Sequence, residues 1–124
     1  MDVGETYTHE RTFTHEGVLQ FAELTGDDQP RHTKPDEEGR LLVQGLLTGS
    51  LLTKIGGDHE VLSRRIDLHF SQPVYTGQPL TCRWTTDHLD DRGEHTYLEA
   101  SVVVERPGEQ APEVVLEATV EGYI

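Results

Sequence analysis

The sequence is poor in cysteine and in lysine and has no long hydrophobic run, and each shortage excludes a class of protein. Cys82 is the only cysteine, so neither an internal disulfide nor a metal site of several cysteines is available. The 10 basic residues are outnumbered by 23 acidic ones, and the formal net charge is −13. A general nucleic-acid-binding protein needs a basic face, so this class is excluded.

Membrane attachment is also not expected. No apolar run reaches the roughly 18 residues that a membrane span requires, and an acidic protein is a poor electrostatic ligand for lipid headgroups. The first five residues, Met1 to Glu5, are polar and acidic, which leads us to expect no signal peptide. We therefore expect a cytoplasmic protein without a membrane partner.

The acidic charge is spread evenly over the chain. Residues 1–60 hold 12 acids and 5 bases, and residues 61–124 hold 11 acids and 5 bases. Uniform acidity with only two lysines is typical of a surface adapted to high salt. At ~1 M salt the Debye length falls to about 3 Å, so repulsion between the acidic side chains is largely screened. We hypothesise a halophilic source. The length of 124 residues favours one domain over residues 1–124.

The first half of the chain has helical patterns. Thr14 is a candidate N-cap, Val18 and Ala22 follow at helical spacing, and Gly26 is a natural stop. A polar loop over 26–40 comes next, and loops of this length in small domains are usually functional. Residues 41–53 carry no charge, and the leucines of a helix over 45–56 would cover most of its circumference. This pattern predicts a helix buried on nearly all sides and ended by Gly56 and Gly57.

From Val61 onward the apolar residues alternate with polar ones, which predicts strands with one buried face. Turns are expected at 72–79, at 90–93 and at 106–112. In the last strand, Leu116, Ala118 and Val120 are predicted to be buried, with Val115 on the wet face. The expected fold class is α+β, an antiparallel sheet with one face against the buried helix, and the economical geometry wraps the sheet around that helix.

Asp27 and His32 are the candidate chemical groups. They lie five residues apart on a loop that contains Pro30, and an Asp with a His can hold a water molecule and move its protons. The spacing alone also fits an Asp27 that orders the turn and a His32 that is solvated. Asp28 is the competing carboxylate, interpreted as a solvated neighbour.

The residues around this pair resemble a family signature. The segment 21–32, FAELTGDDQPRH, is similar to the pattern of the MaoC-like dehydratases, which include the (R)-specific enoyl-CoA hydratases. The segment 43–50, VQGLLTGS, resembles the start of that family's central helix, and 70–77, FSQPVYTG, resembles one of its turns. Three positions depart from the pattern: Gln29 replaces an Asn, Arg31 replaces an aliphatic residue, and Lys34 stands where an acidic residue is usual.

The resemblance implies a hot-dog fold and an enoyl-CoA hydratase, or 3-hydroxyacyl-thioester dehydratase, acting on an acyl-CoA thioester. Asp27 and His32 would hold the catalytic water, with Asp27 as the base. Gly45, at the start of the buried helix, would let the thioester oxygen approach the helix N–H groups. The remaining predicted substrate-binding residues are Gln29, Thr53, Arg64 and Arg65. The two arginines are expected to bind the phosphates of coenzyme A. At most one of them should face the ligand, because neighbouring side chains on a strand point to opposite faces.

The resemblance also implies a homodimer or a higher oligomer, with sheets paired edge to edge. No metal site is expected, since no histidine pair has metal-binding helical spacing, and no cofactor is expected beyond coenzyme A as part of the substrate. Three alternatives stay open: an acyl-CoA thioesterase, a non-catalytic module that binds acyl thioesters, and a partner subunit that is active only beside another chain.

Overall fold

The computed structural model describes all residues, 1–124. The elements in chain order are β1 (Thr6–Thr12), α1 (His15–Thr25), α2 (Pro30–Thr33), α3 (Gly45–Gly49), α4 (Leu51–Asp58), β2 (Leu62–Phe70), β3 (Pro79–Asp91), β4 (Thr96–Arg106) and β5 (Glu113–Tyr123). None of these helices combines the length and the apolar character that crossing a membrane requires.

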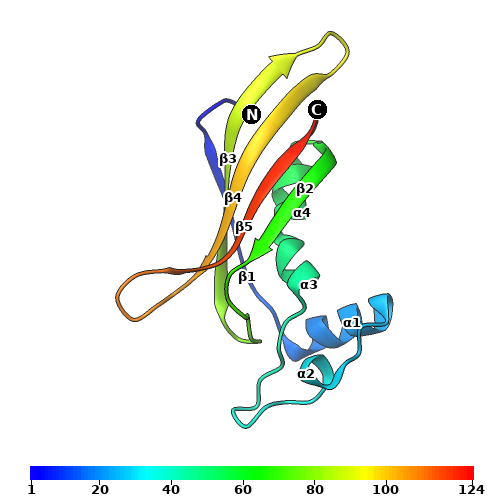
Figure 1. Ribbon diagram of the computed structural model, residues 1–124, viewed down its shortest axis with the longest axis vertical. Coiled ribbons are helices and arrows are strands. Elements are labelled where there is room, and N and C mark those ends of the chain that lie inside the picture. Colours follow the sequence, from blue (N-terminus) through cyan, green and yellow to red (C-terminus); the bar gives the residue numbers. More distant parts are fainter.

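The strands form one antiparallel sheet in the order β1-β3-β4-β5-β2. In Figure 1, α3 and α4 run along one side of this long, twisted sheet, and α1 and α2 form a small lobe near the lower end. The prediction of an α+β fold with an antiparallel sheet packed around a central helix is therefore confirmed.

The core lies between the sheet and α4. Leu51, Leu52 and Ile55 of α4 join one buried cluster with Trp84 of β3 and the apolar residues of β4 and β5. The indole Nε1 of Trp84, itself buried, donates a hydrogen bond of 3.1 Å to Thr86 Oγ1. This satisfies both polar groups inside the apolar layer, as burial requires.

The first helix has the caps that its sequence predicts. The Thr14 side chain accepts a hydrogen bond from the N–H of Gly17, and Gly26 closes α1 in the left-handed conformation with φ at 82°. Phe13 and Val18, on either side of the N-cap, are both buried, which fits a hydrophobic staple. The polar loop that follows contains a helix the sequence reasoning missed, α2, which begins at Pro30.

The central helix differs from its prediction in three ways. It is divided at Ser50 into α3 and α4, and α4 continues to Asp58 rather than stopping at Gly56 and Gly57. It is also not buried on nearly all sides, because Leu46 is 64% exposed. The sheet covers one side of the helix only, so the leucine on the other side remains in solvent.

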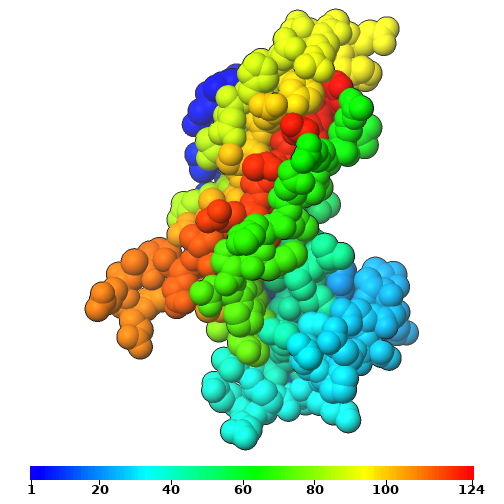
Figure 2. Space-filling view, in the orientation of Figure 1, coloured from blue at the N-terminus to red at the C-terminus, as the bar shows by residue number.

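Strand β2 is the largest departure from the predicted pattern of burial. The predicted alternation is interrupted, because the register of the β2–β5 pair shifts between Ser63 and Arg65. Leu62 is 75% exposed, and Ile66 and Phe70 are about half exposed. β2 is an edge strand that pairs with β5 alone, and in Figure 2 it forms a continuous exposed ridge, shown in green. The opposite edge is β1, a polar strand that the sequence reasoning did not predict.

A β-bulge explains one wrong assignment in β5. The register of the β4–β5 pair shifts between Val104 and Glu105, whose partners are Leu116 and Val114, so Val115 has no partner in the ladder. Val115 and Leu116 are consequently both buried, although alternation placed Val115 on the wet face.

Candidate functional site

The Asp27 and His32 side chains converge because a helix end, a proline and a short helix follow one another within a few residues. Gly26 ends α1 in a left-handed turn, and Asp27 comes directly after it. Pro30 then takes the first position of α2, where its missing N–H costs no helical hydrogen bond. His32 is carried by this single turn of helix, which points its ring back toward the Asp27 carboxylate.

The two side chains are in contact. Nε2 of His32 lies 3.6 Å from Oδ2 of Asp27. The His32 side chain is 7% exposed and that of Asp27 is 45% exposed, so the pair lies at the boundary between the interior and the solvent. The other carboxylate oxygen, Oδ1, accepts a hydrogen bond of 2.8 Å from the Gln29 side-chain amide. The longer glutamine therefore still reaches the carboxylate and orients it.

The backbone sets the tautomer of His32. Its Nδ1 lies 2.6 Å from the carbonyl oxygen of Leu42, which can only accept a hydrogen bond, so Nδ1 carries a proton. In the neutral ring Nε2 is then an acceptor, facing a carboxylate oxygen that is also an acceptor. The backbone N–H of Leu42 in turn donates to the carbonyl of Arg31 at 3.0 Å, which ties α2 to the segment before α3.

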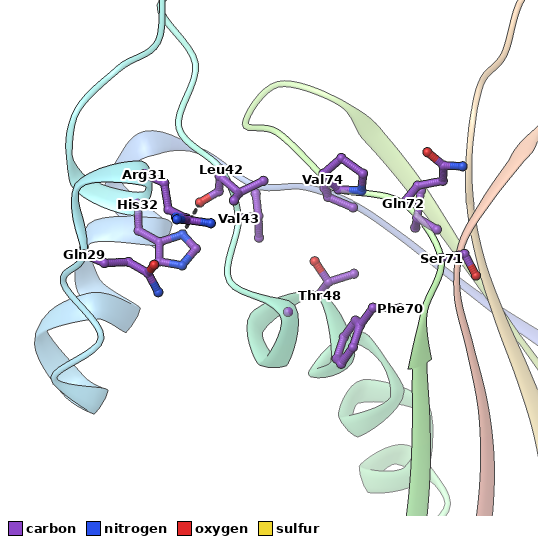
Figure 3. Close-up of a pocket in the computed structure, with 13 residues that line it drawn as sticks. Gln29, Arg31, His32, Leu42, Val43, Thr48, Phe70, Ser71, Gln72 and Val74 are labelled. Atoms are coloured by element: carbon purple, nitrogen blue, oxygen red, sulfur yellow. Dashed lines mark hydrogen bonds between the residues drawn. The ribbon is translucent and has the colours of Figure 1, made fainter.

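A cavity of about 390 Å³ opens between α2, α3 and the end of β2. In Figure 3, Gln29 and His32 lie on one side of this space and Thr48 and Phe70 lie on another. Asp27 is not a lining residue and is linked to the cavity through its contacts with His32 and Gln29.

Gly45 lines the same cavity at the N-terminus of α3. The N-cap residue, Gln44, makes no side-chain capping bond and instead donates from its amide to the carbonyl of Val18 at 3.0 Å. The first N–H groups of a helix have no partner within the helix. A Cβ at position 45 would lie 3.1 Å from the Phe70 ring, so glycine keeps this end of the cavity open.

The structure does not bring the other predicted binding residues to this cavity. Thr53 lines a different one, together with Gly49 and Trp84. Arg64 and Arg65 line a third, beside Arg92. Both arginines line this depression, because a β-bulge at Arg64 interrupts the alternation that would place neighbouring side chains on opposite faces of the strand.

Several residues that form the cavity are not among the site residues predicted from the sequence. Thr48 is buried and lines it from α3, one turn after Gly45, and helical spacing from Gly45 was the signal that could have identified it. Phe70 and Arg31 are also lining residues. The Leu42 carbonyl that fixes the His32 ring is a backbone group, so no side-chain motif reports it. No cluster of three or more histidine, cysteine or acidic side chains that could hold a metal ion occurs in the structure.

Comparison with known proteins found a curated relative of part of the chain. No family model matches the chain. A curated relative, the mitochondrial 3-hydroxyacyl-[acyl-carrier-protein] dehydratase of Arabidopsis thaliana, is 29% identical over 87 residues. The match covers 64% of this chain and 52% of the relative, so the chain spans about half the length of that protein.

Solved structures match nearly the whole chain. The (R)-hydratase PhaJ1 of Pseudomonas aeruginosa matches with a TM-score of 0.84 and 18% identity, over 98% of this chain and 81% of the other. The (R)-hydratase from A. caviae involved in PHA biosynthesis matches with a TM-score of 0.78 and 21% identity, over 98% and 96%. The ChsH1-ChsH2 complex of Mycobacterium tuberculosis matches with a TM-score of 0.79 and 19% identity, over 99% and 98%. The chain thus has the hot-dog fold that the sequence resemblance implied.

Proposed function

We propose that this protein is a hydro-lyase that adds water to a 2-enoyl thioester, or removes it from a 3-hydroxyacyl thioester, at the cavity between α2 and α3. One observation carries the proposal: Nε2 of His32 and Oδ2 of Asp27 lie 3.6 Å apart beside the cavity, and in the neutral ring both atoms are acceptors. Two acceptors at this distance repel each other unless a donor bridges them. A water molecule can do so, because it can donate one hydrogen bond to each acceptor. A water held in this way keeps both lone pairs for attack.

The hydration step follows from that placement. The water oxygen attacks C3 of the enoyl group while Asp27 takes one of its protons, and the dyad returns a proton to C2. Gln29 holds the other carboxylate oxygen, and the Leu42 carbonyl holds the imidazole ring, so neither group must reorient during the reaction. Dehydration is the same path in the reverse direction.

Negative charge grows on the thioester oxygen as the water attacks. We place this oxygen at the start of α3, where free N–H groups and the absent side chain of Gly45 offer a donor site. The reaction needs no metal ion and no cofactor other than the carrier of the acyl group. The names of the relatives, a 3-hydroxyacyl-[acyl-carrier-protein] dehydratase and two (R)-hydratases, support this reaction class.

The test follows the loss of the enoyl absorbance of crotonyl-CoA. We expect Asp27→Asn and His32→Gln each to lower kcat by about 10² to 10⁴, the usual contribution of a general acid or base. Asp28→Asn, which changes a neighbouring carboxylate, is the matched control and is expected to keep the wild-type rate. Equal rates in all four proteins would refute the dyad.

The same samples separate the alternative functions. An acyl-CoA thioesterase would release free thiol, which a thiol reagent detects. A binding module would bind the thioester without turnover, and Asp27→Asn would leave its affinity unchanged. A partner subunit would become active only after a second hot-dog chain is added.

We also propose that two copies of this chain pair through β2 into a homodimer, or into a higher assembly built from such dimers. The support is the exposed edge: Leu62, Ile66 and Phe70 are exposed apolar residues on a strand that has an unpaired side. Light scattering should give twice the chain mass of 13.9 kDa for the wild type and the single mass for Ile66→Asp. A monomeric wild type would contradict this assembly.

We further propose a halophilic, cytoplasmic protein. The support is the net charge of −13 spread over both halves of the chain. Salt screens this self-repulsion, so the melting temperature should rise between dilute buffer and molar KCl. A melting temperature that stays constant or falls would contradict the high-salt hypothesis.

A further inference from the structure

Arg106, the last residue of β4, has the least exposed side chain of all the basic residues. Its side chain is 14% exposed and that of Arg40 is 31% exposed, while every other basic residue of the chain is exposed. A guanidinium loses hydration when it is buried, and its N–H donors must then find acceptors within the protein. The partners of Arg106 therefore indicate what its burial achieves.

The guanidinium of Arg106 reaches the turn that joins β2 to β3. Nη1 donates to the carbonyl oxygen of Pro73 and, at 3.2 Å, to the side-chain oxygen of Gln78. Nη2 donates at 3.4 Å to Glu113, the cross-strand partner of Arg106 on β5. Two of the three acceptors thus belong to the turn, and only the third is a carboxylate. The planar fork of the guanidinium can hold all three at once, so it clamps the turn to the end of β4.

The clamped turn forms one wall of the cavity beside the dyad of Asp27 and His32. Four consecutive residues of the turn, 71–74, line this cavity, and Figure 3 shows their side of it away from His32. The side-chain oxygen of Gln78 also accepts the N–H of Tyr75 at 3.0 Å, so the clamp extends to the middle of the turn. Arg106 itself is not a lining residue. Its effect on the cavity must therefore pass through the turn.

The turn also holds the backbone that fixes the His32 ring. Leu42 forms a β-bridge with Tyr75 of the turn, and backbone hydrogen bonds of 2.8 Å and 3.0 Å join the turn to the residues on either side of Leu42. The bonded pairs are the Val43 N–H with the Val74 carbonyl and the Thr76 N–H with the Leu41 carbonyl. The carbonyl oxygen of Leu42, which lies 2.6 Å from Nδ1 of His32, is thereby held from both sides. A continuous series of hydrogen bonds runs from Arg106 through the turn to the imidazole.

We propose that Arg106 is a positioning residue for the dyad: by clamping the β2–β3 turn, it sets the position of the Leu42 carbonyl and, through it, the tautomer and orientation of the His32 imidazole. The inference rests on the proposed hydration of a thioester at this dyad. Arg106 contacts neither the cavity nor the reacting atoms, so it exchanges no proton with the substrate. Its contribution is rigidity, because a displacement of about 1 Å at a reacting centre can cost on the order of 10²-fold in rate.

Three variants separate the clamp from the ion pair. Arg106→Met removes all three contacts, whereas Glu113→Gln removes the ion pair and leaves both contacts with the turn. We expect Arg106→Met to lower kcat for crotonyl-CoA about tenfold, with KM within about threefold of the wild type, and Glu113→Gln to keep both values. Arg106→Lys keeps the charge but lacks the planar fork, so it should recover only part of kcat.

Nitrogen NMR of the histidine ring measures the position of His32 directly. In the wild type, Nδ1 should carry the proton, because the Leu42 carbonyl accepts it. In Arg106→Met we expect a larger share of the tautomer protonated at Nε2, which can donate to the Asp27 carboxylate instead. Glu113→Gln should keep the wild-type tautomer, and His32→Gln identifies the signals by their absence.

The outcomes separate this inference from the proposed function. If the wild type does not hydrate crotonyl-CoA, the proposed function fails, and the tautomer of His32 alone decides whether Arg106 positions the ring. An unchanged tautomer in Arg106→Met would overturn the positioning role, and so would equal losses in Glu113→Gln, because the ion pair would then account for the effect. If Arg106→Met does not fold, Gln78→Met replaces it, since it removes one acceptor of the clamp and leaves the arginine in place. Gln78→Met should change the tautomer in the same direction, and no change would overturn the proposal.

Discussion

Replacing Gly45 with alanine tests whether the start of α3 serves the substrate or only the fold. The new Cβ would lie 3.1 Å and 3.2 Å from two carbon atoms of the Phe70 ring, a few tenths of an ångström too close. Phe70 is about half exposed, so its ring can move toward solvent, at a cost of about 1 kcal/mol. Alanine also lowers the conformational entropy of the unfolded chain, which stabilises the folded protein by roughly 0.4–1 kcal/mol and offsets most of this cost. The expected change in the free energy of unfolding is therefore below about 1 kcal/mol.

The expected effect on activity is much larger. The methyl group would stand where we place the thioester oxygen, and a displacement of about 1 Å at a reacting centre can cost on the order of 10²-fold in rate. We expect Gly45→Ala to lower kcat for crotonyl-CoA hydration by about 10- to 100-fold while urea denaturation stays close to wild type.

A second substitution separates the two causes of that loss. Combining Gly45→Ala with Phe70→Leu removes the ring contact but leaves the methyl group in the cavity, so the rate should stay low. Recovery of activity in the double variant would assign the effect to Phe70 instead. A fully active Gly45→Ala protein, or one destabilised by about 3 kcal/mol or more, would refute the assignment of this helix end to the thioester.

Two further predictions concern the fold. A Cβ at Gly122 would lie 2.4 Å from the backbone oxygen of Leu62, so Gly122→Ala should force β2 from β5 and lower the free energy of unfolding by roughly 3 kcal/mol. Gly57→Ala is the control, because a Cβ at this position meets no atom within 4 Å. Its free energy of unfolding in urea should be unchanged or higher. Equal changes in the two variants would contradict the β2–β5 register. Burial raises the pKa of the Cys82 thiol from 9.0 to about 11. The thiol therefore ionises at lower pH in the unfolded chain than in the folded protein. The free energy of unfolding should decline between about pH 9 and 11, and it should decline more in the wild type than in Cys82→Ala. The same decline in both proteins would argue against a buried thiol.

Local patterns in the sequence correctly predicted several elements because those elements depend on neighbouring residues. Thr14 and Gly26 bound α1 through capping and a left-handed turn, which are properties of a few consecutive residues. The same holds for the turn at Gly93, with φ at 86°, that joins β3 to β4. The convergence of Asp27 and His32 is also local, since a single loop carries both.

Predictions that depended on distant parts of the chain were less accurate. Val115 is buried because a β-bulge forms opposite β4, and Leu46 is exposed because the sheet covers only one side of α3 and α4. Thr53, Arg64 and Arg65 were chosen for their chemistry, but they line other cavities. Burial and proximity of this kind depend on which elements pack together, which no local pattern specifies.

Capping residues predicted the ends of α1, the alternation of apolar side chains predicted the strands and the α+β class, and side-chain chemistry together with the family resemblance identified the pair Asp27 and His32. Each of these signals lies within a short stretch of the sequence. Three features depend on the folded chain: the Leu42 carbonyl fixes the His32 ring, Thr48 and Phe70 complete the cavity, and Arg31 and Lys34 line another cavity with Arg40. These contacts join segments that are separate in the chain, and hydrogen bonds between α1, α2 and the segment before α3 hold them in place.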